Sequence, residues 1–223
     1  MTGADDRRLR FLVAEDHGIV RDGLISLIGR EHGWEVVAAA EDGRSAVVLA
    51  LESTPDVVVM DVTMPRLNGI DATRQILSSS PATRIIALSV HTDGRIVTEM
   101  LRAGARGYLV KDAVFDELRE AVRTVLEGRR YVSPGVLDGL LDDYLQIAAS
   151  DPGSAFSVLS EREREVLQLI AEGRSTRQIS LDLSVSVKTV ESHRANIMKK
   201  LGASSVADLT RYAVREGIVR LEI

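Results

Sequence analysis

Residues 57–69 read Val57-Val-Val-Met-Asp-Val-Thr-Met-Pro-Arg-Leu-Asn-Gly69 and give the clearest indication of the fold. Its first four residues are all apolar, whereas a strand with one exposed face would alternate apolar and polar residues. An unbroken apolar run is typical of a strand that is buried on both faces, as in a parallel sheet. Asp61 follows the run directly. We therefore predict a central strand over residues 56–60 with a carboxylate at its end.

Short apolar runs lie on both sides of this strand, and amphipathic stretches separate them. The predicted strands are 10–15, 34–40, 56–60, 84–89 and 106–110. A helical spacing of apolar residues follows each of them, for example Ile70, Ile76 and Leu77 after the central strand. Five β–α units in about the first 128 residues predict a doubly wound α/β domain with a five-stranded parallel sheet.

Polar residues stand where the predicted strands end. Glu15 and Asp16 end the first strand, Asp61 the third, Ser89 the fourth and Lys111 the fifth. The carboxyl ends of parallel strands meet at one edge of the sheet, so these side chains should converge there. Three clustered carboxylates call for a cation, and oxygen ligands suit Mg²⁺. A carboxylate can also attack phosphorus, while a metal and a lysine neutralise the transferring group and Ser89 donates a hydrogen bond to it.

Composition narrows the classes of function. The chain has no cysteine, which excludes a disulfide framework, thiolate metal sites and a cysteine nucleophile, and fits the cytoplasm. No apolar stretch resembles a signal peptide or is long enough to cross a membrane, so we expect no membrane partner. Residues 157–223 hold 11 basic and 9 acidic residues, whereas residues 1–156 hold 17 and 24. An acidic half joined to a mildly basic half indicates two domains with different partners.

The middle of the chain reads as a partly helical linker over residues 129–156. Residues 134–149 fit a helix, because Pro134 suits a first turn and four leucines form a face. The breakers of Ser150-Asp-Pro-Gly-Ser154 predict a flexible joint.

Residues 157–223 predict a smaller all-helical domain of four helices. Ser160-x-x-Glu163 is a capping-box pattern, and Gly173, Gly202 and Gly217 mark helix ends. The turn at residues 184–186 joins two helices so tightly that the second, about 187–201, can enter the major groove of DNA.

The helix over residues 187–201 has a buried face formed by Val190, Ile197 and Leu201. The positions left to face DNA are Lys188, Thr189, Glu191, Ser192, Arg194 and Ala195, and Lys199 and Lys200 can reach phosphates. We expect His193 to pack or to bond a phosphate. Glu191 either accepts from cytosine N4 or pairs with a nearby arginine. Arg162 and Arg164 are expected to be solvated.

The motifs of the first half resemble the receiver domains of two-component response regulators. The resemblance lies in residues 61–69, in Glu15-Asp16, in Ala87-Leu-Ser89 and in Gly107-Tyr-Leu-Val-Lys111, and it spans about residues 8–128. It implies a flavodoxin-like fold in which Asp61 accepts a phosphoryl group from a cognate histidine kinase. It further implies that Mg²⁺ is held by Glu15, Asp16, Asp61 and the Thr63 backbone carbonyl, that Ser89 and Lys111 bind phosphoryl oxygens, and that Ser89 and Tyr108 act as a switch. Such a protein catalyses only its own phosphotransfer and dephosphorylation.

Two positions depart from the usual pattern of receivers. Glu15 stands where many receivers carry aspartate, and it reaches one methylene farther toward a metal. Asp112 follows Lys111 where many receivers carry proline. A cis bond before a non-proline residue costs about 2.5–4 kcal/mol, and the sequence leaves the isomer open.

The second half resembles the DNA-binding domain of the LuxR family. The resemblance lies in residues 159–167, in Thr189-Val-Glu-Ser-His193 and in residues 196–202, and it covers about residues 157–220. Together with the receiver motifs, it points to the NarL/FixJ subfamily. It implies a transcription factor that binds a pseudo-palindromic operator as a homodimer, with the last helix, about 204–216, at the dimer contact.

Three hypotheses remain open at this point. The first is that the unphosphorylated receiver hinders DNA binding or dimerisation until phosphorylation shifts the population. The second is a regulator of the same architecture that works without phosphorylation. The third is an aspartyl-phosphate hydrolase. Such enzymes need a second acid two residues after the nucleophile, where this chain has Thr63.

Overall fold

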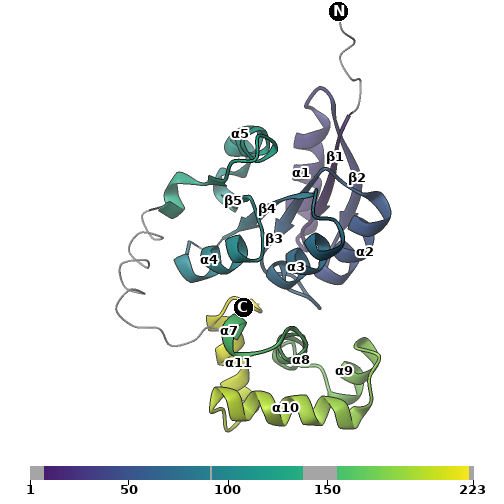
Figure 1. Ribbon diagram of the computed structural model, residues 1–223, viewed down its shortest axis with the longest axis vertical. Helices are drawn as coiled ribbons and strands as arrows, with labels where there is room; N and C mark the ends of the chain where they lie inside the picture. The colour runs from purple at the N-terminus through teal and green to yellow at the C-terminus, as the bar shows by residue number, and fades with distance from the viewer. Residues whose placement is uncertain (1–7, 91, 138–154, 221–223) are drawn as a thin grey trace, which may run out of the picture.

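A parallel sheet forms the centre of the N-terminal unit in the computed structural model, which describes residues 8–90, 92–137 and 155–220 (Figure 1). The strand order is β2-β1-β3-β4-β5-β6, and every neighbouring pair is parallel. The strands are β1 Leu9–Ala14, β2 Trp34–Ala40, β3 Val57–Asp61, β4 Arg84–Ser89, β5 Gly107–Val110 and β6 Tyr131–Val132. The predicted fold class is thus confirmed.

The sixth strand was not predicted from the sequence. The Tyr131 N–H donates to the Arg106 carbonyl, and the Ser133 N–H donates to the Tyr108 carbonyl, each at 2.9 Å. A two-residue strand shows no periodicity, so only its pairing with β5 identifies it. It lies within the segment that was predicted to be linker.

Helices cover both faces of the sheet. They are α1 Gly18–Gly29, α2 Gly43–Ser53, α3 Gly69–Ser79, α4 Gly94–Arg102 and α5 Val114–Leu126. Val58 and Met60 of β3 belong to the core under α2, α3 and α4, whereas Val57 and Val59 belong to the core under α1 and α5. The central strand is therefore buried on both faces, as its unbroken apolar run predicts.

The C-terminal unit is helical, as predicted. Its helices are α7 Ala155–Val158, α8 Glu161–Ala171, α9 Thr176–Asp182, α10 Val187–Leu201 and α11 Val206–Arg215. The Ser160 side chain accepts from the Glu163 N–H, and the Glu163 carboxylate accepts from the Ser160 N–H, so the predicted capping box forms. Its core includes Val166, Ile179 and Ile197.

Little of the predicted linker can be compared with the structure. Residues 134–137 are helical. The rest of the predicted helix, residues 138–149, and the breakers at 150–154 lie outside the described residues. In the ranges that the structure does describe, no helix combines the length and the apolar character that a membrane crossing requires.

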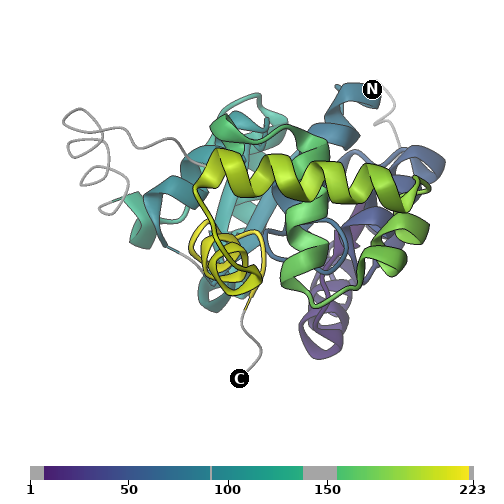
Figure 2. The same cartoon turned by 90° about the horizontal axis from the view of Figure 1, so that it is seen from below.

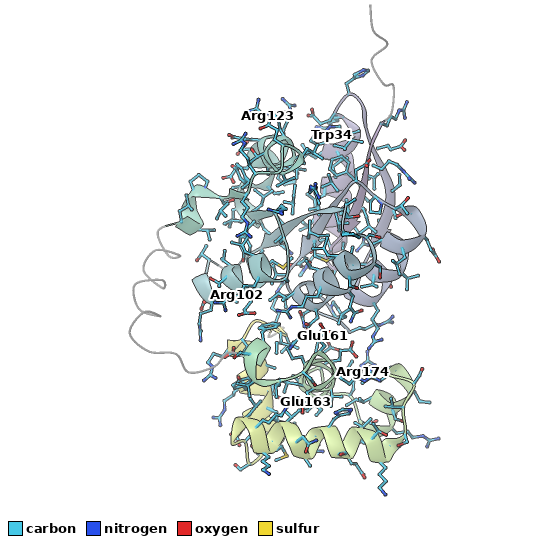
Figure 3. The ribbon with its side chains drawn as sticks, in the orientation of Figure 1. Trp34, Arg102, Arg123, Glu161, Glu163 and Arg174 are labelled. Carbon is cyan, nitrogen blue, oxygen red and sulfur yellow. The ribbon has the colours of Figure 1, made fainter. Side chains whose placement is uncertain are left out.

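The two units are packed against each other along α8. Figure 1 shows α8 between the sheet unit and α10. Figure 2, seen from below, shows α10 lying across the outer side of the helical unit. Side chains from both units fill the junction (Figure 3).

Candidate functional site

The polar residues at the carboxyl ends of β1, β3 and β5 converge on one point. The Lys111 ammonium lies 2.8 Å from Asp61 Oδ2 and 2.8 Å from Glu15 Oε2. Both carboxylates are fully buried, and the Lys111 side chain is 10% exposed. A lysine shared between two buried carboxylates leaves the cluster with excess negative charge, which favours a further cation.

The Asp61 carboxyl group has an unusual environment. Burial raises its pKa well above the ordinary value, and the neighbouring charge of Glu15 raises it further. Lys111 and Arg220 lower the pKa and offset only part of this increase. Ionisation of Asp61 is therefore favoured by any positive charge that enters the cluster.

Four side chains could hold a metal ion. One ligand atom from each of Glu15, Asp16, His17 and Asp61 can be chosen so that all lie within 4.8 Å of one another. Glu15 Oε2 is buried and accepts no hydrogen bond of good geometry within the described residues, although it is in ion-pair contact with Lys111. A buried carboxylate oxygen with this unused capacity fits a hard divalent cation.

His17 was not among the residues predicted from the sequence. Its Nδ1 lies 2.7 Å from Asp16 Oδ1 and 3.1 Å from Glu15 Oε1. The only signal in the sequence is that it directly follows two acidic residues. His17 therefore adds a nitrogen to an otherwise oxygen-only cluster.

The segment after Asp61 is held by tight backbone packing. The Gly69 N–H donates to the Val62 carbonyl at 2.8 Å. A Cβ added at Gly69 would lie 2.0 Å from the Asp61 carbonyl oxygen, so only glycine fits there. Asn68 caps α3 by accepting from the Asp71 N–H at 2.9 Å. The Thr63 N–H donates to Asp61 Oδ1 at 3.2 Å, which brings Thr63 to the site.

Ser89 ends β4, and Tyr108 is the second residue of the neighbouring strand β5. Both are buried, and the Tyr108 hydroxyl shares a hydrogen bond with Ser89. Burial is also the main reason why the pKa of Tyr108 is raised. The aromatic ring is thus already turned inward in this structure.

The bond between Lys111 and Asp112 is trans. No cis peptide bond occurs in the part of the chain that the structure describes. Lys111 opens the short 3₁₀ turn Lys111–Ala113 that leads into α5.

The predicted DNA-facing residues lie on α10, the outer helix of the C-terminal unit. Ser186 caps this helix by accepting from the Thr189 N–H at 3.0 Å. Exposed positions are Lys188, Glu191, Ser192, Ala195, Lys199 and Lys200, whereas Thr189, His193 and Arg194 are half-buried. Glu191 forms no ion pair with any described residue, so pairing with a nearby arginine is not seen.

One predicted phosphate contact is already engaged within the protein. The Lys200 ammonium donates to the Glu163 carboxylate at 2.6 Å. Glu163, which is labelled in Figure 3, lies on the side of α8 that faces α10. Lys199 makes the better candidate for a phosphate contact, because it has no ion pair with any residue that the structure describes.

Arg164 is buried, not solvated as predicted. It is 3% exposed, and its guanidinium donates to the Asp71 carboxylate of α3 at 2.6–3.1 Å. Arg162 is also engaged, donating to Glu165 at 2.6 Å and to the Leu183 carbonyl at 2.7 Å. For Arg164 the prediction was wrong because the sheet unit covers this side of α8, whereas Arg162 remains half-exposed.

Residues of α8 and its C-cap form hydrogen bonds with the loop that follows Asp61. The Gln168 amide donates to the Met64 carbonyl at 2.8 Å and accepts from the Asn68 N–H at 2.9 Å. The Glu172 carboxylate accepts from the Arg66 N–H at 3.0 Å. A change in the shape of this loop would therefore act directly on the helical unit.

Two family models match the chain. One, described as a response regulator receiver domain, covers residues 11–123, and the other, described as bacterial regulatory proteins of the luxR family, covers residues 157–213. The transcriptional regulatory protein DegU of Brevibacillus brevis is 34% identical, over 97% of this chain and 98% of that protein. The oxygen regulatory protein NreC of Staphylococcus carnosus is 37% identical, over 95% of this chain and 99% of that protein.

Solved structures show similarity as well. A two-component response regulator of the LuxR family from Aurantimonas sp. is 38% identical, with a TM-score of 0.59 over 62% of this chain and 99% of that one. The response regulator RcsB of Salmonella typhimurium, whose structure is described in terms of conformational dynamism for DNA interaction, is 25% identical. Its TM-score is 0.57 over 94% of this chain and 99% of that one.

Proposed function

Because the chain belongs to the two-component response regulators that carry a LuxR-type DNA-binding domain, we propose that phosphorylation of Asp61 controls its regulation of transcription. The observation that carries the proposal is the buried Asp61 carboxylate, 2.8 Å from the Lys111 ammonium and beside Glu15. We assign phosphoryl chemistry to residues 8–128 and DNA binding to residues 157–223.

The proposed chemistry begins with attack by a carboxylate oxygen of Asp61 on the phosphohistidine of a partner kinase. The P–N bond of that histidine breaks as the acyl phosphate forms. Lys111 would neutralise the phosphoryl oxygens, and Ser89 would exchange its hydrogen bond with Tyr108 for one to the phosphoryl group. This chemistry acts on the protein itself, so we propose no enzymatic activity toward other substrates.

Charge neutralisation during transfer would also come from Mg²⁺. We propose that Glu15, Asp16, Asp61 and the Thr63 backbone carbonyl hold it, and that His17 lies beside this ligand set. The support is the close approach of the acidic side chains and the unused capacity of Glu15 Oε2.

DNA binding is assigned to α10. Its exposed face and its position after the tight turn at 184–186 support insertion into the major groove. We propose that Lys188, Thr189, Glu191, Ser192, His193 and Arg194 meet the groove and that Lys199 reaches phosphate. We propose that a homodimer binds a pseudo-palindromic operator, since a two-fold symmetric dimer matches such a site, and that the protein acts in the cytoplasm.

Mass spectrometry of the intact protein tests the proposal. Wild type, Asp61→Asn and Asp112→Asn are each treated with a small acyl phosphate and Mg²⁺. We expect one added phosphoryl group on the wild type and on Asp112→Asn, and none on Asp61→Asn. Absence of the adduct from the wild type would favour the phosphorylation-independent regulator, provided that beryllofluoride also fails to bind.

A further inference from the structure

A residue from the far end of the chain enters the acidic cluster. Arg220 follows α11, and its Nη2 lies 3.5 Å from Asp61 Oδ2. Its Nη1 lies 3.4 Å from both ring nitrogens of His17, so the guanidinium is placed against the imidazole. The segment that carries Arg220 lies between the two units in Figure 1.

The Arg220 guanidinium is held by charge more than by hydrogen bonds. Its Nε and Nη2 are buried and have no hydrogen-bond partner among the described residues. A guanidinium is always protonated in proteins, and a buried cation without bonds is unfavourable unless anions surround it. The acidic cluster of Glu15, Asp16 and Asp61 supplies that negative charge.

Arg220 occupies the approach to the proposed metal site. A cleft of about 420 Å³ between the two units is lined by Asp16, His17 and Thr63 on one side and by Glu172 and Arg220 on the other. The proposed cation ligands and the guanidinium therefore share one space. A divalent ion in that space would meet the positive charge of Arg220 at short range.

The position of Arg220 depends on the docking of the helical unit. The preceding residues Ile218 and Val219 are 0% and 9% exposed and belong to the core of that unit. The unit itself is fixed by Arg164 on Asp71 and by Gln168 on the loop after Asp61. Docking of the helical unit therefore brings Arg220 to the cluster.

We propose that Arg220 is a built-in substitute for the divalent cation, which neutralises the empty acidic cluster and holds the helical unit against it. Binding of the cation and of the phosphoryl group displaces Arg220 and loosens the docking. Because the two equilibria are linked, docking weakens cation binding by the same factor by which cation binding weakens docking. The inference rests on the proposed function of Asp61 and adds to it the route by which the site reports to the DNA-binding unit.

The first test measures Mn²⁺ binding to the full chain, by the spectroscopic signal of the free ion. The variants are Arg220→Gln, Arg220→Lys and, as a matched control, Arg211→Gln, whose side chain is 80% exposed on the same unit. We expect Arg220→Gln to bind Mn²⁺ roughly 3- to 30-fold more tightly than the wild type, as loss of one partly screened charge predicts. Arg220→Lys should bind Mn²⁺ almost as weakly as the wild type, and the Mn²⁺ affinity of Arg211→Gln should match that of the wild type.

Unchanged or weaker Mn²⁺ binding by Arg220→Gln would overturn the inference. Weaker beryllofluoride binding by Arg220→Gln at saturating Mg²⁺ would also overturn it, because Arg220 would then be a ligand of the phosphoryl group. If the wild type binds neither Mn²⁺ nor beryllofluoride, the proposed function fails instead.

The second test measures docking by energy transfer between two dyes. The chain has no cysteine, so Leu51→Cys on α2 and Leu181→Cys on α9 give two unique labels, both at exposed positions. Mg²⁺ with beryllofluoride should lower the transfer in the otherwise wild-type chain, and Arg220→Gln should lower it without any ligand. Equal transfer in the ligand-free chain, the ligand-bound chain and ligand-free Arg220→Gln would show that the site and the docking are not coupled.

Discussion

The charge of Asp61 depends on its burial more than on any single partner. Burial and Glu15 raise its folded-state pKa above the ordinary value of 3.8. At pH values between the ordinary pKa and the raised folded-state pKa, the folded chain binds more protons than the unfolded chain. The free energy of unfolding therefore falls as the pH rises through this range. Burying this carboxylate therefore lowers stability at neutral pH in exchange for a reactive group.

Asp61→Asn removes this effect. Without metal, we expect the variant to be more stable than the wild type by roughly 1–3 kcal/mol at about pH 7.5 and nearly equal at about pH 4.5. Urea unfolding in a chelator at the two pH values measures the difference, with Asp112→Asn as the control carboxylate. A gain of the same size at both pH values would rule out the assigned pKa shift.

Gly69 fixes the backbone beside Asp61. Since an added Cβ would lie 2.0 Å from the Asp61 carbonyl oxygen, Gly69→Ala must displace the main chain of the site. We expect a loss of about 3 kcal/mol in the free energy of unfolding together with slower phosphoryl uptake. Gly29→Ala, where nothing lies within 4 Å of the added atom, should change stability by less than about 1 kcal/mol. Similar losses in both variants would contradict the close approach.

At the scale of the element, α8 has two different partners. Its apolar side packs into the helical core through Val166 and Leu167, and its polar side meets α3 through Arg164. An amphipathic helix normally turns its charged side to water. Here the charged side is an interface between the two units.

Arg164→Gln should therefore weaken the docking. Asp71 would lose its closest ion pair but keep Arg74, which donates to it at 2.8 Å. We expect the docked state to lose about 2 kcal/mol, less than for a buried carboxylate left without any partner. Small-angle scattering should show a larger radius of gyration, while Arg177→Gln, an exposed position on α9, should not change it. A compact Arg164→Gln chain would show that other contacts suffice.

In the molecule as a whole, docking leaves the outer side of α10, which we propose to face DNA, uncovered. Figures 1 and 2 both place α10 on the outer side of the helical unit. The C-terminal end of α11 instead meets the sheet unit, where a Cβ added at Gly217 would lie 2.7 Å from Ile96 Cδ1. Of the two forms of the autoinhibition hypothesis, this arrangement favours hindered dimerisation.

Binding to half-site and to full-site DNA distinguishes hindered DNA binding from hindered dimerisation. We expect the full chain and residues 155–223 to bind a single half-site with affinities within about threefold, a difference below about 1 kcal/mol. On a two-half-site operator, phosphorylation or beryllofluoride should strengthen binding of the full chain. Much weaker half-site binding by the full chain would mean that the receiver masks α10 after all.

Local sequence patterns were enough to predict the first five strands, the helical unit and the group of residues at the strand ends. Unbroken apolar runs such as 57–60 mark strands that are buried on both faces, and parallel strands bring their carboxyl ends together. Glu15, Asp61 and Lys111 could be grouped for that reason alone. The turn at 184–186 and its caps likewise act over a few residues, so the helices around it were predictable.

Features that depend on contacts between distant parts of the chain became visible in the folded structure alone. Strand β6 exists through pairing with β5, Arg164 is buried by Asp71, 93 residues away, and Arg220 reaches His17 across 203 residues. Local patterns report which side of a helix is polar, not whether another unit covers it. The two units dock because attraction between buried charges outweighs the cost of their desolvation, and this docking also inserts Arg220 into the acidic cluster. Such a balance cannot be predicted from a local sequence pattern.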